Sequence, residues 1–431
     1  MTKHFTPISL HYTAADGPRK LECSVPSDHD IQIYGPSWPK EPLSAEGLRD
    51  ALTLPFQIDR ETLVIVNDLD RPTPTGAIFA ALSDTHPDIL SCDILVATGA
   101  HKLTEDPDVI KRAVLGDIAP AHTGGFHIHN CWDDPMMRVG ATRRGTEVTV
   151  SGRLFSYGRI AAVGSVEPHW FAGYTGGRKS LIPGVSAYET IRQNHSLASH
   201  PDARHMKTDG NPLHEDLIDA TTRVIDAHRK KWGGSSIVGV NAVAHADDIC
   251  YITTAPILDS IDPLRDAVDA IYSTRAYRAD IVIALAEAPM DRDIYQAMKS
   301  FENTRFILNP GGVFLLVAAA PDGVGPPHFS RTLSLGGRPG DLGEHLAGSY
   351  ELGNHKFINP LHFVQNNGRL LVCSEALSSL PGGPAALGFF QAESSFPRAF
   401  DTALSHIQTS GTHAPRVAVV RDAVNTVLIP R

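Results

Sequence analysis

The sequence predicts an α/β protein with two domains and mainly parallel sheets, and three observations lead to this prediction. Apolar runs of strand length alternate with segments of helical spacing, as at residues 62–68, 75–86 and 92–101. Polar residues follow these runs, as they do at the carboxyl ends of parallel strands, where ligands bind. The length of 431 residues is typical of two or three domains. We expect the active site to lie in the cleft between the two domains.

The composition is that of a globular protein whose charge leaves local basic residues free to bind small anions. Hydrophobic residues make up 42% and charged residues 20% of the chain. The net charge is −10 without any basic run, which argues against nucleic acid and membranes as partners. The N-terminus lacks the apolar core of a secretory signal, and the five scattered cysteines indicate reduced thiols. We therefore expect a cytoplasmic protein.

The first predicted domain covers residues 1–265 and contains a β-α-β unit. Its strands are predicted at 62–68, 92–101 and 159–169, with helices at 75–86 and 186–200. The second predicted domain covers residues 266–431. It is expected to contain helices at 262–278 and 293–308, and strands at 279–289, 311–321, 369–377 and 416–423. The Pro- and Gly-rich segment 321–345 is expected to be a loop.

The turn "GYTGGRKSLIPG" at residues 173–184 nearly matches a phosphate-binding P-loop. A P-loop has Gly, four free positions, and then Gly-Lys-Ser/Thr. Here Gly173 is followed by four residues, and Arg178 then occupies the place of the second glycine before Lys179 and Ser180. The glycines allow a ligand to approach the backbone closely, and backbone amides of such a turn can hold a phosphate. A P-loop-like phosphotransferase is therefore one candidate function.

Charged and ring side chains follow the predicted strands at several points. Asp68, Asp70 and Arg71 follow the run at 62–68, and an arginine fork suits a carboxylate or phosphate. His101 follows the run at 92–101, where it would face a cleft. His169 precedes the glycine-rich turn.

Two further groups of residues are candidates for binding or for metal ligation. Gln296 and Lys299 stand three positions apart, on one face of a predicted helix. The histidines of "HTGGFHIHNCWDD" are spaced like a metal pair, but the flanking Asn and Asp residues favour a turn over a metal site. These histidines are His122, His127 and His129.

Taken together, these segments resemble the nickel-dependent lactate racemase family, whose members invert 2-hydroxy acids. The matching pieces are "DLDRP", "ATGAH", "PHWFAGYTGGRKSLIPG", "NH" at 194–195 and "YQAMK". They lie in the family's order over residues 68–299, and the segment around the glycine-rich turn is the most specific of them.

The resemblance implies a cofactor and a role for each matching residue. The cofactor is a nickel-pincer nucleotide, a pyridinium mononucleotide whose sulfur-bearing arms hold nickel, and it implies cofactor-synthesis proteins as partners. The implied roles are as follows: His101 and His169 as the acid/base pair; Lys179 as the thioamide tether, with Asp68, Gly176, Gly177 and Arg178 beside the cofactor; His195 as the nickel ligand; Arg71, Gln296 and Lys299 at the substrate.

The implied activity is a racemase or epimerase that inverts the hydroxyl-bearing carbon of a small 2-hydroxy acid. Hydride transfer to the cofactor would avoid removing a proton beside an ionised carboxylate, and two histidines would serve the two mirror-image substrates. A non-catalytic relative that kept the cofactor pocket is an alternative. An NAD-dependent dehydrogenase is disfavoured because no G-x-G-x-x-G motif joins a strand to a helix.

The sequence departs from the family pattern beside the substrate-binding arginine. Asp70 replaces the usual threonine, and a carboxylate there would repel a second acidic group, which bears on whether lactate is the substrate. Lys102 supplies the basic residue after His101. Trp170 and Phe357 are candidates for the aromatic residue of the substrate pocket.

Overall fold

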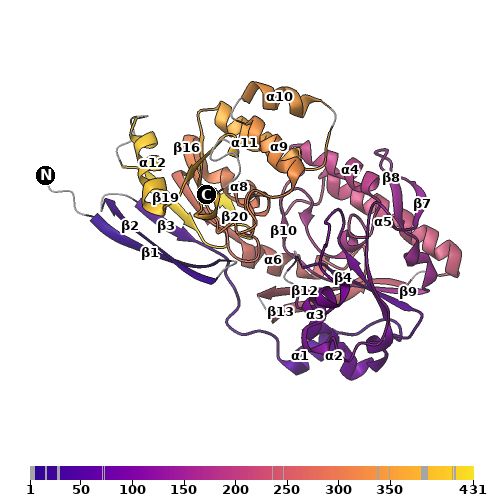
Figure 1. Ribbon diagram of the computed structural model, residues 1–431. Coiled ribbons are helices and arrows are strands. Elements are labelled where there is room, and N and C mark those ends of the chain that lie inside the picture. The colour runs from indigo at the N-terminus through magenta and orange to yellow at the C-terminus, as the bar shows by residue number, and fades with distance from the viewer. Residues whose placement is uncertain are drawn as a thin grey trace. The chain divides into compact units, whose positions relative to one another are not determined.

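The computed structural model describes most of the chain, and its α/β architecture confirms the predicted fold class (Figure 1). The described residues are 5–14, 17–26, 30–69, 71, 73–234, 236–245, 247–336, 339–348, 350–379, 387–409, 411 and 414–431. Asp70, which the sequence analysis singled out, lies outside them. Within the described ranges, no helix combines the length and apolarity needed to cross a membrane.

The chain forms two compact units, and these are not two consecutive segments of the sequence. The first unit is Trp38–Ile271, and the second combines Met1–Ser37 with Tyr272–Arg431. The predicted first domain of residues 1–265 includes residues 1–37, whereas β3 (Asp30–Tyr34) pairs with β19 (Arg416–Val420) in the sheet of the second unit. The expected cleft between the domains stays a prediction.

The first unit is built on a six-stranded sheet with the strand order β13-β12-β9-β4-β5-β6. All neighbouring strands are parallel except the pair β12–β13. The strands are β4 (Thr62–Asn67), β5 (Asp93–Ala97), β6 (Phe126–Ile128), β9 (Arg159–Ser165), β12 (Ser236–His245) and β13 (Asp248–Pro256). Short two-stranded pairs join β7 (Met136–Ala141) to β8 (Glu147–Ser151), and β10 (Pro168–His169) to β11 (Gly173–Tyr174).

Helices cover both faces of this sheet, because its strands are apolar on both sides. In β4, Val64 and Val66 pack in a core with residues of α2 and α3, while Leu63 and Ile65 face a second core with residues of α5. The helices are α1 (Ala45–Ala51), α2 (Thr75–Thr85), α3 (Pro107–Leu115), α4 (Tyr188–Ser196), α5 (Pro212–Trp232) and α6 (Arg265–Tyr272). The predicted helix at 262–278 ends at Tyr272.

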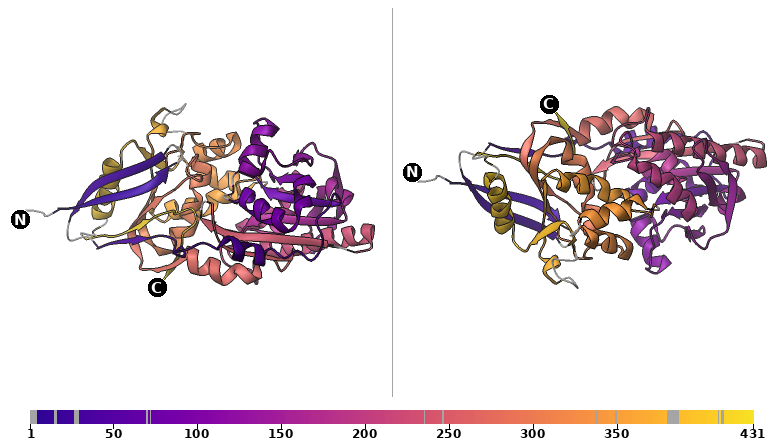
Figure 2. Two further views of the ribbon diagram at one scale, coloured as in Figure 1. Left: turned by 90° about the horizontal axis from the view of Figure 1, so that it is seen from below. Right: turned by 90° about the horizontal axis from the view of Figure 1, so that it is seen from above.

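The second unit has an all-parallel sheet with the strand order β18-β17-β16-β15-β19-β3. Its remaining strands are β15 (Ala279–Leu285), β16 (Leu308–Val317), β17 (Arg369–Cys373) and β18 (Phe390–Glu393), and the pair β14 (Ser273–Ala276) with β20 (Val427–Pro430) stands apart. The hairpin of β1 (Phe5–Ala14) and β2 (Gly17–Pro26) lies against α12 (Phe396–Thr409) (Figure 2).

The predicted loop at 321–345 is wrong, because two helices form there. These are α9 (Pro327–Leu335) and α10 (Pro339–Ala347). Pro327 occupies the first position of α9, where a missing N–H costs nothing, and Phe329 and Leu333 bury one face in the core. The predicted helix at 293–308 is interrupted at Met298 between α7 (Ile294–Ala297) and α8 (Lys299–Thr304), and α11 (His355–Gln365) packs in the same core.

A buried carboxylate anchors helix α4, which carries His195. Asp216 of α5 is 1% exposed and accepts hydrogen bonds from Thr142 Oγ1 at 2.6 Å, Thr146 Oγ1 at 2.8 Å and Asn194 Nδ2 at 2.8 Å. Asn194 directly precedes His195. Asp216 therefore joins the β7–β8 hairpin and α4 to α5.

We predict that Asp216→Ala lowers the free energy of unfolding by about 3 kcal/mol, because it leaves three buried donors without their acceptor. Urea unfolding followed by circular dichroism measures this change. Asp226→Ala is the matched control, since Asp226 pairs with Arg229 on the exposed face of the same helix. We expect that control to cost no more than about 0.5 kcal/mol. Equal losses in both variants would contradict the anchoring role.

Candidate functional site

Most of the predicted site residues follow three adjacent strands of the first unit. The strand order places β4 between β9 and β5, and all three are parallel, so their carboxyl ends lie side by side. Asp68 directly follows β4, and His101 follows β5 by four residues. Glu167 and His169 follow β9. Side chains that are distant in sequence are thereby brought together at one edge of the sheet.

Asp68 contacts the first of the two predicted acid/base histidines. Its Oδ2 atom lies 2.7 Å from Nδ1 of His101. Asp68 is 5% exposed, whereas the His101 side chain is 40% exposed. A carboxylate only accepts hydrogen bonds, so Nδ1 of His101 carries the proton of this contact. Asp68 thereby fixes the orientation and tautomer of the imidazole, a role that the sequence analysis did not assign to it.

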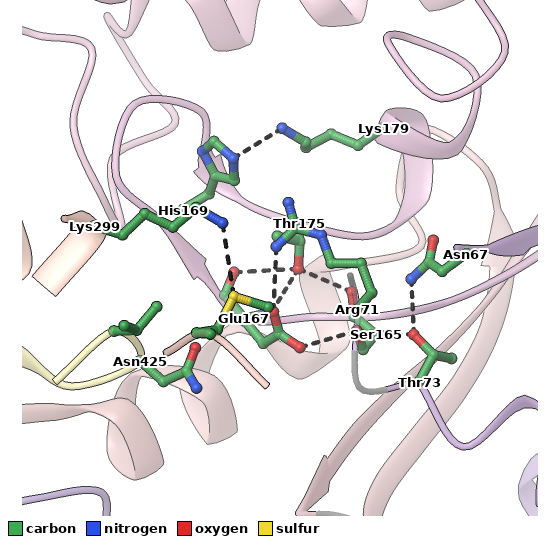
Figure 3. Close-up of polar contacts among 12 residues, drawn as sticks. Asn67, Arg71, Thr73, Ser165, Glu167, His169, Thr175, Lys179, Lys299 and Asn425 are labelled. Carbon is green, nitrogen blue, oxygen red and sulfur yellow. Dashed lines mark hydrogen bonds and ion pairs between the residues drawn. The ribbon is translucent and has the colours of Figure 1, made fainter. Parts of the chain in front are cut away.

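His169 is held at the end of a short hairpin, next to Lys179. It pairs with Gly173 across β10 and β11, and its Nδ1 accepts the Ala172 N–H at 3.3 Å. Its Nε2 lies 3.2 Å from Nζ of Lys179, as Figure 3 shows. The second predicted acid/base residue and the predicted tether are therefore direct neighbours.

The buried ring of Phe171 lies between the predicted catalytic and metal-binding residues. Its centroid is 4.3 Å from the ring centroid of His169, 5.0 Å from that of His195 and 5.4 Å from Nζ of Lys179. Phe171 is 4% exposed and packs edge-to-face with Trp170. This aromatic residue sets the spacing of the other three.

His195 is in the last turn of α4, in surroundings that favour a neutral imidazole. The pKa of His195 is lowered to about 3, first by burial and then by the charge of Lys179. A neutral imidazole is the form that ligates a metal. The predicted metal ligand thus has the required protonation state at neutral pH.

The glycine-rich turn is shaped by its own packing. Gly176 and Gly177 have φ angles of +73° and +52°, which favour glycine. A Cβ atom on Gly176 would lie 2.8 Å from Oδ1 of Asn241, and one on Gly177 would lie 2.7 Å from Oγ of Ser260. The Gly177 N–H donates to Asn241 at 2.8 Å. Close packing against the protein itself therefore explains these two glycines.

Arg178 points into the protein from this turn. It is 1% exposed, and its guanidinium donates to the carbonyl groups of Ala172 and Tyr174 and to Nδ1 of His214. Burial lowers the pKa of Arg178 to about 10. Arg178 thus stabilises the turn from inside, and its predicted contact with the cofactor stays a prediction.

Arg71 lies beside a buried carboxylate that the sequence analysis did not single out. Its NH1 group is 3.8 Å from Oε2 of Glu167, which is 6% exposed (Figure 3). The Arg71 side chain itself is 24% exposed. Arg71 follows β4 and Glu167 follows β9, so the pair spans two adjacent strands.

Gln296 and Lys299 belong to the second unit. Gln296 is in α7, whose first turn is capped by Asp293, and its backbone N–H donates to Asp293 Oδ1 at 2.7 Å. Lys299 begins α8, and its Nζ lies 3.8 Å from Sδ of Met290. The buried Lys356 donates to the Tyr295 carbonyl at 2.6 Å, and its Nζ lies 3.2 Å from the centroid of the Tyr295 ring. Lys356 thereby fixes the short helix that carries Gln296.

The remaining candidates have structural partners. His122 and His129 are buried and contact the carbonyl groups of Cys92 and Ser186, while His127 lies 3.6 Å from Asp93. Phe357 is buried and stacks on Phe329 in the core of the second unit. Across the described ranges, no three His, Cys, Asp or Glu side chains gather as a metal site.

Glu167, Phe171 and Lys356 are site residues that the sequence analysis missed. Glu167 and Phe171 both flank His169 in "EPHWF", so their proximity to a candidate catalytic residue was the available signal. Lys356 lies far from Gln296 in sequence, and only the packing of α11 beside α7 brings it near. No local pattern indicates such a contact.

We predict that His214→Gln makes the protein less sensitive to acid. The pKa of His214 is lowered from 6.5 to about 3, first by burial and then by Arg178. Below pH 6.5 the unfolded chain binds a proton that the folded protein does not, so stability falls as the pH falls. Glutamine can accept the Arg178 hydrogen bond without titrating.

Urea unfolding at about pH 7 and about pH 4.5 measures this effect as the loss of unfolding free energy between the two conditions. The loss should be smaller in His214→Gln than in the wild type. His200→Gln, which changes an exposed histidine of the same unit, should leave the loss unchanged. An undiminished loss in His214→Gln would show that His214 takes up its proton in the folded state.

Two family models match this chain, and both describe lactate racemase domains. The model described as the lactate racemase N-terminal domain matches residues 17–206. The model described as the lactate racemase C-terminal domain matches residues 274–347. Together they cover more than half of the chain.

Two curated relatives are similar to this chain over part of their length. The lactate racemase of Thermoanaerobacterium thermosaccharolyticum is 27% identical over 299 residues, covering 66% of this chain and 65% of that protein. The lactate racemase of Lactiplantibacillus plantarum is 28% identical over 287 residues, covering 63% of each. The matches thus span slightly less than two thirds of these relatives.

Two solved structures share the fold. The lactate racemase apoprotein from T. thermosaccharolyticum superposes with a TM-score of 0.80 at 21% identity, covering 98% of this chain and 100% of that one. A protein from Thermotoga maritima superposes with a TM-score of 0.68 at 14% identity, covering 92% of this chain and all of that one. The family matches and the shared fold lead to one conclusion: this chain belongs to the lactate racemase family.

Proposed function

We propose that this protein is a racemase or epimerase that inverts the hydroxyl-bearing carbon of a small 2-hydroxy acid. One observation carries the proposal, namely that His169, His195 and Lys179 surround the ring of Phe171. Acid/base, metal-binding and tethering side chains are thus gathered in one place. Family membership supports the same activity.

His101 is suited to take and return the proton of the substrate hydroxyl. Asp68 accepts a hydrogen bond from its Nδ1, so Nε2 is the nitrogen that exchanges the proton. When Nε2 gains a proton, the adjacent carboxylate stabilises the imidazolium. Since the His101 side chain is 40% exposed, a small substrate can reach it.

His169 is suited to serve the mirror-image substrate. Because its Nδ1 accepts the Ala172 N–H, a neutral ring carries its proton on Nε2, facing Nζ of Lys179. Only the uncharged amine, formed when the Lys179 ammonium loses a proton, can accept that hydrogen bond. The uncharged amine is also the nucleophilic form, which a covalent tether requires.

The donor set fits the nickel-pincer nucleotide that the family resemblance implies. Burial and the nearby Lys179 keep the imidazole of His195 neutral, which is the form that ligates a metal. The described residues provide no cluster of three protein donors. A metal at His195 would therefore take its other donors from the cofactor, and sulfur with imidazole suits nickel. When bound, the cofactor would supply the hydride acceptor. Lys179 would hold it covalently, and cofactor-synthesis proteins are the partners that this requires.

The substrate carboxylate is assigned to Arg71, and the family resemblance implies Gln296 and Lys299 as further substrate-binding residues. Arg71 offers a planar set of N–H donors that can hold a carboxylate while the rest of the molecule turns. Glu167 holds one side of this guanidinium, which limits its motion.

A cytoplasmic location stays a prediction.

The phosphotransferase alternative is weakened by the turn itself. Arg178 replaces the second P-loop glycine and is buried among carbonyl groups. The Gly177 N–H, which a P-loop would direct at a phosphate, donates to Asn241. The Gly177 N–H and the Arg178 guanidinium are thus used within the protein, and Lys179 is the residue of the turn that we assign to the cofactor.

The tether is tested by intact-mass spectrometry of protein produced together with the cofactor-synthesis proteins. We expect an added mass that peptide mapping places on Lys179, and we expect its loss in Lys179→Ala. Lys207→Ala, which changes a lysine paired with Asp202, should keep the added mass. The same preparation should invert one or more acids of a chiral panel of 2-hydroxy acids. A panel without any inversion would contradict the proposed activity.

The acid/base assignment is tested by His101→Ala and His169→Ala. We expect each to lower kcat at least about 100-fold, the range typical of losing a general acid or base. The added mass should be retained, since neither residue is the tether. His200→Ala, which removes an exposed histidine, should leave kcat unchanged. Unchanged turnover in both catalytic variants would instead favour other acid/base groups, and a loaded wild type without turnover would favour the non-catalytic alternative.

A further inference from the structure

Glu167 is a buried carboxylate in a fixed position beside the predicted substrate anchor. Its backbone N–H donates to Thr175 Oγ1 at 2.8 Å, and its carbonyl accepts the Thr175 N–H at 2.9 Å. Its Oε1 accepts the Ser165 hydroxyl at 3.0 Å, and its Oε2 lies 3.8 Å from NH1 of Arg71 (Figure 3). Both the backbone and the carboxylate are therefore held in place.

A chain of hydrogen bonds ends on this carboxylate. Asn67 Nδ2 donates to Thr73 Oγ1 at 2.8 Å, and Thr73 donates to Ser165 Oγ at 3.1 Å. Ser165 then donates to Glu167 (Figure 3). Every hydroxyl in the chain points its proton toward Glu167, and successive hydrogen bonds of one direction strengthen each other. The Glu167 carboxylate therefore accepts the Ser165 hydroxyl at Oε1 and has Arg71 beside Oε2.

Two carboxylates already lie near Arg71 before a substrate binds. Arg71 pairs with Glu167, and Asp68, which precedes Arg71 by three residues, is a second buried carboxylate. A substrate carboxylate on Arg71 would share this cation with Glu167. The guanidinium has five N–H donors, so it can serve both groups. A second substrate carboxylate, however, would be repelled by the charge of Glu167.

We propose that Glu167 is a specificity-determining residue that restricts the substrates to 2-hydroxy acids with a single carboxylate. This inference rests on the proposed function and on Arg71 as the carboxylate anchor. Glu167 acts in two ways: it holds the Arg71 guanidinium in place, and its charge disfavours dianionic substrates. The first effect applies equally to all substrates that use Arg71. The second effect changes the ratio of kcat/KM for a diacid to kcat/KM for a monoacid. This ratio therefore isolates the proposed role in specificity.

The test compares malate with lactate as substrates of the loaded wild type, Glu167→Gln and Glu167→Asp. Glutamine keeps the acceptor for Ser165 but removes the charge, and aspartate keeps the charge. We expect the ratio of kcat/KM for malate to that for lactate to rise about tenfold in Glu167→Gln, from removal of one like charge at short range. In Glu167→Asp the ratio should stay within about twofold of the wild type, because its charge is retained.

Binding of unreactive analogues provides a readout that does not depend on turnover. Propanoate and succinate carry the same carboxylates as lactate and malate but lack the reacting hydroxyl. Calorimetry should show the affinity for succinate rising relative to propanoate in Glu167→Gln, and not in Glu167→Asp.

Equal ratios in the wild type and Glu167→Gln, in turnover and in binding, would overturn this inference while the proposed function stands. A rise of the same size in Glu167→Asp would also overturn it, since the effect would then follow from shape and not from charge. A loaded wild type that inverts neither acid would overturn both the inference and the activity on which it rests.

Discussion

The site depends on the adjacency of three parallel strand ends in the first unit. Because β9, β4 and β5 are neighbours and run in one direction, the segments that follow them must emerge at the same edge of the sheet. Contacts across these segments then fix the side chains: Asp68 with His101, Arg71 with Glu167, and Thr73 with Ser165. The buried apolar strands supply the rigidity, and the polar residues that follow them supply the chemistry.

Neutral imidazoles in low-polarity surroundings are a second feature of this unit. Burial lowers the pKa of both His195 and His214, and in each case a nearby cation lowers it further. The physical cause is the same, but the consequences differ. His214 uses its lone pair to accept from the buried Arg178 and so stabilises the glycine-rich turn. His195 is the residue for which a lone pair suits a metal.

Much of the fold could be predicted from the sequence, because local patterns carry it. The run at 62–68 is apolar on both faces, and it forms β4 at the centre of a sheet that is covered on both sides. The helices at 327–335 and 339–347 were missed because their prolines and glycines read as a loop, although Pro327 begins a helix without cost. The pairing of β3 with β19 joins residues almost four hundred positions apart, and no local pattern encodes it.

The candidate site was predicted residue by residue, but its internal connections were not. His101, His169, Lys179 and His195 stand at recognisable motifs, whereas their supporting contacts are tertiary. The glycines of the turn illustrate the difference: the sequence suggested close approach of a ligand, and the structure shows close approach of Asn241 and Ser260. Phe171 and Glu167 likewise gain their importance from neighbours contributed by other strands and helices.

We propose that His195 is the protein ligand of a sulfur-bound nickel centre beside Lys179. X-ray absorption at the nickel edge, on protein loaded with cofactor, tests this assignment. We expect sulfur scatterers together with one imidazole, and the loss of the imidazole signal in His195→Ala. An imidazole signal that persists unchanged in His195→Ala, or a nickel centre without sulfur, would contradict it.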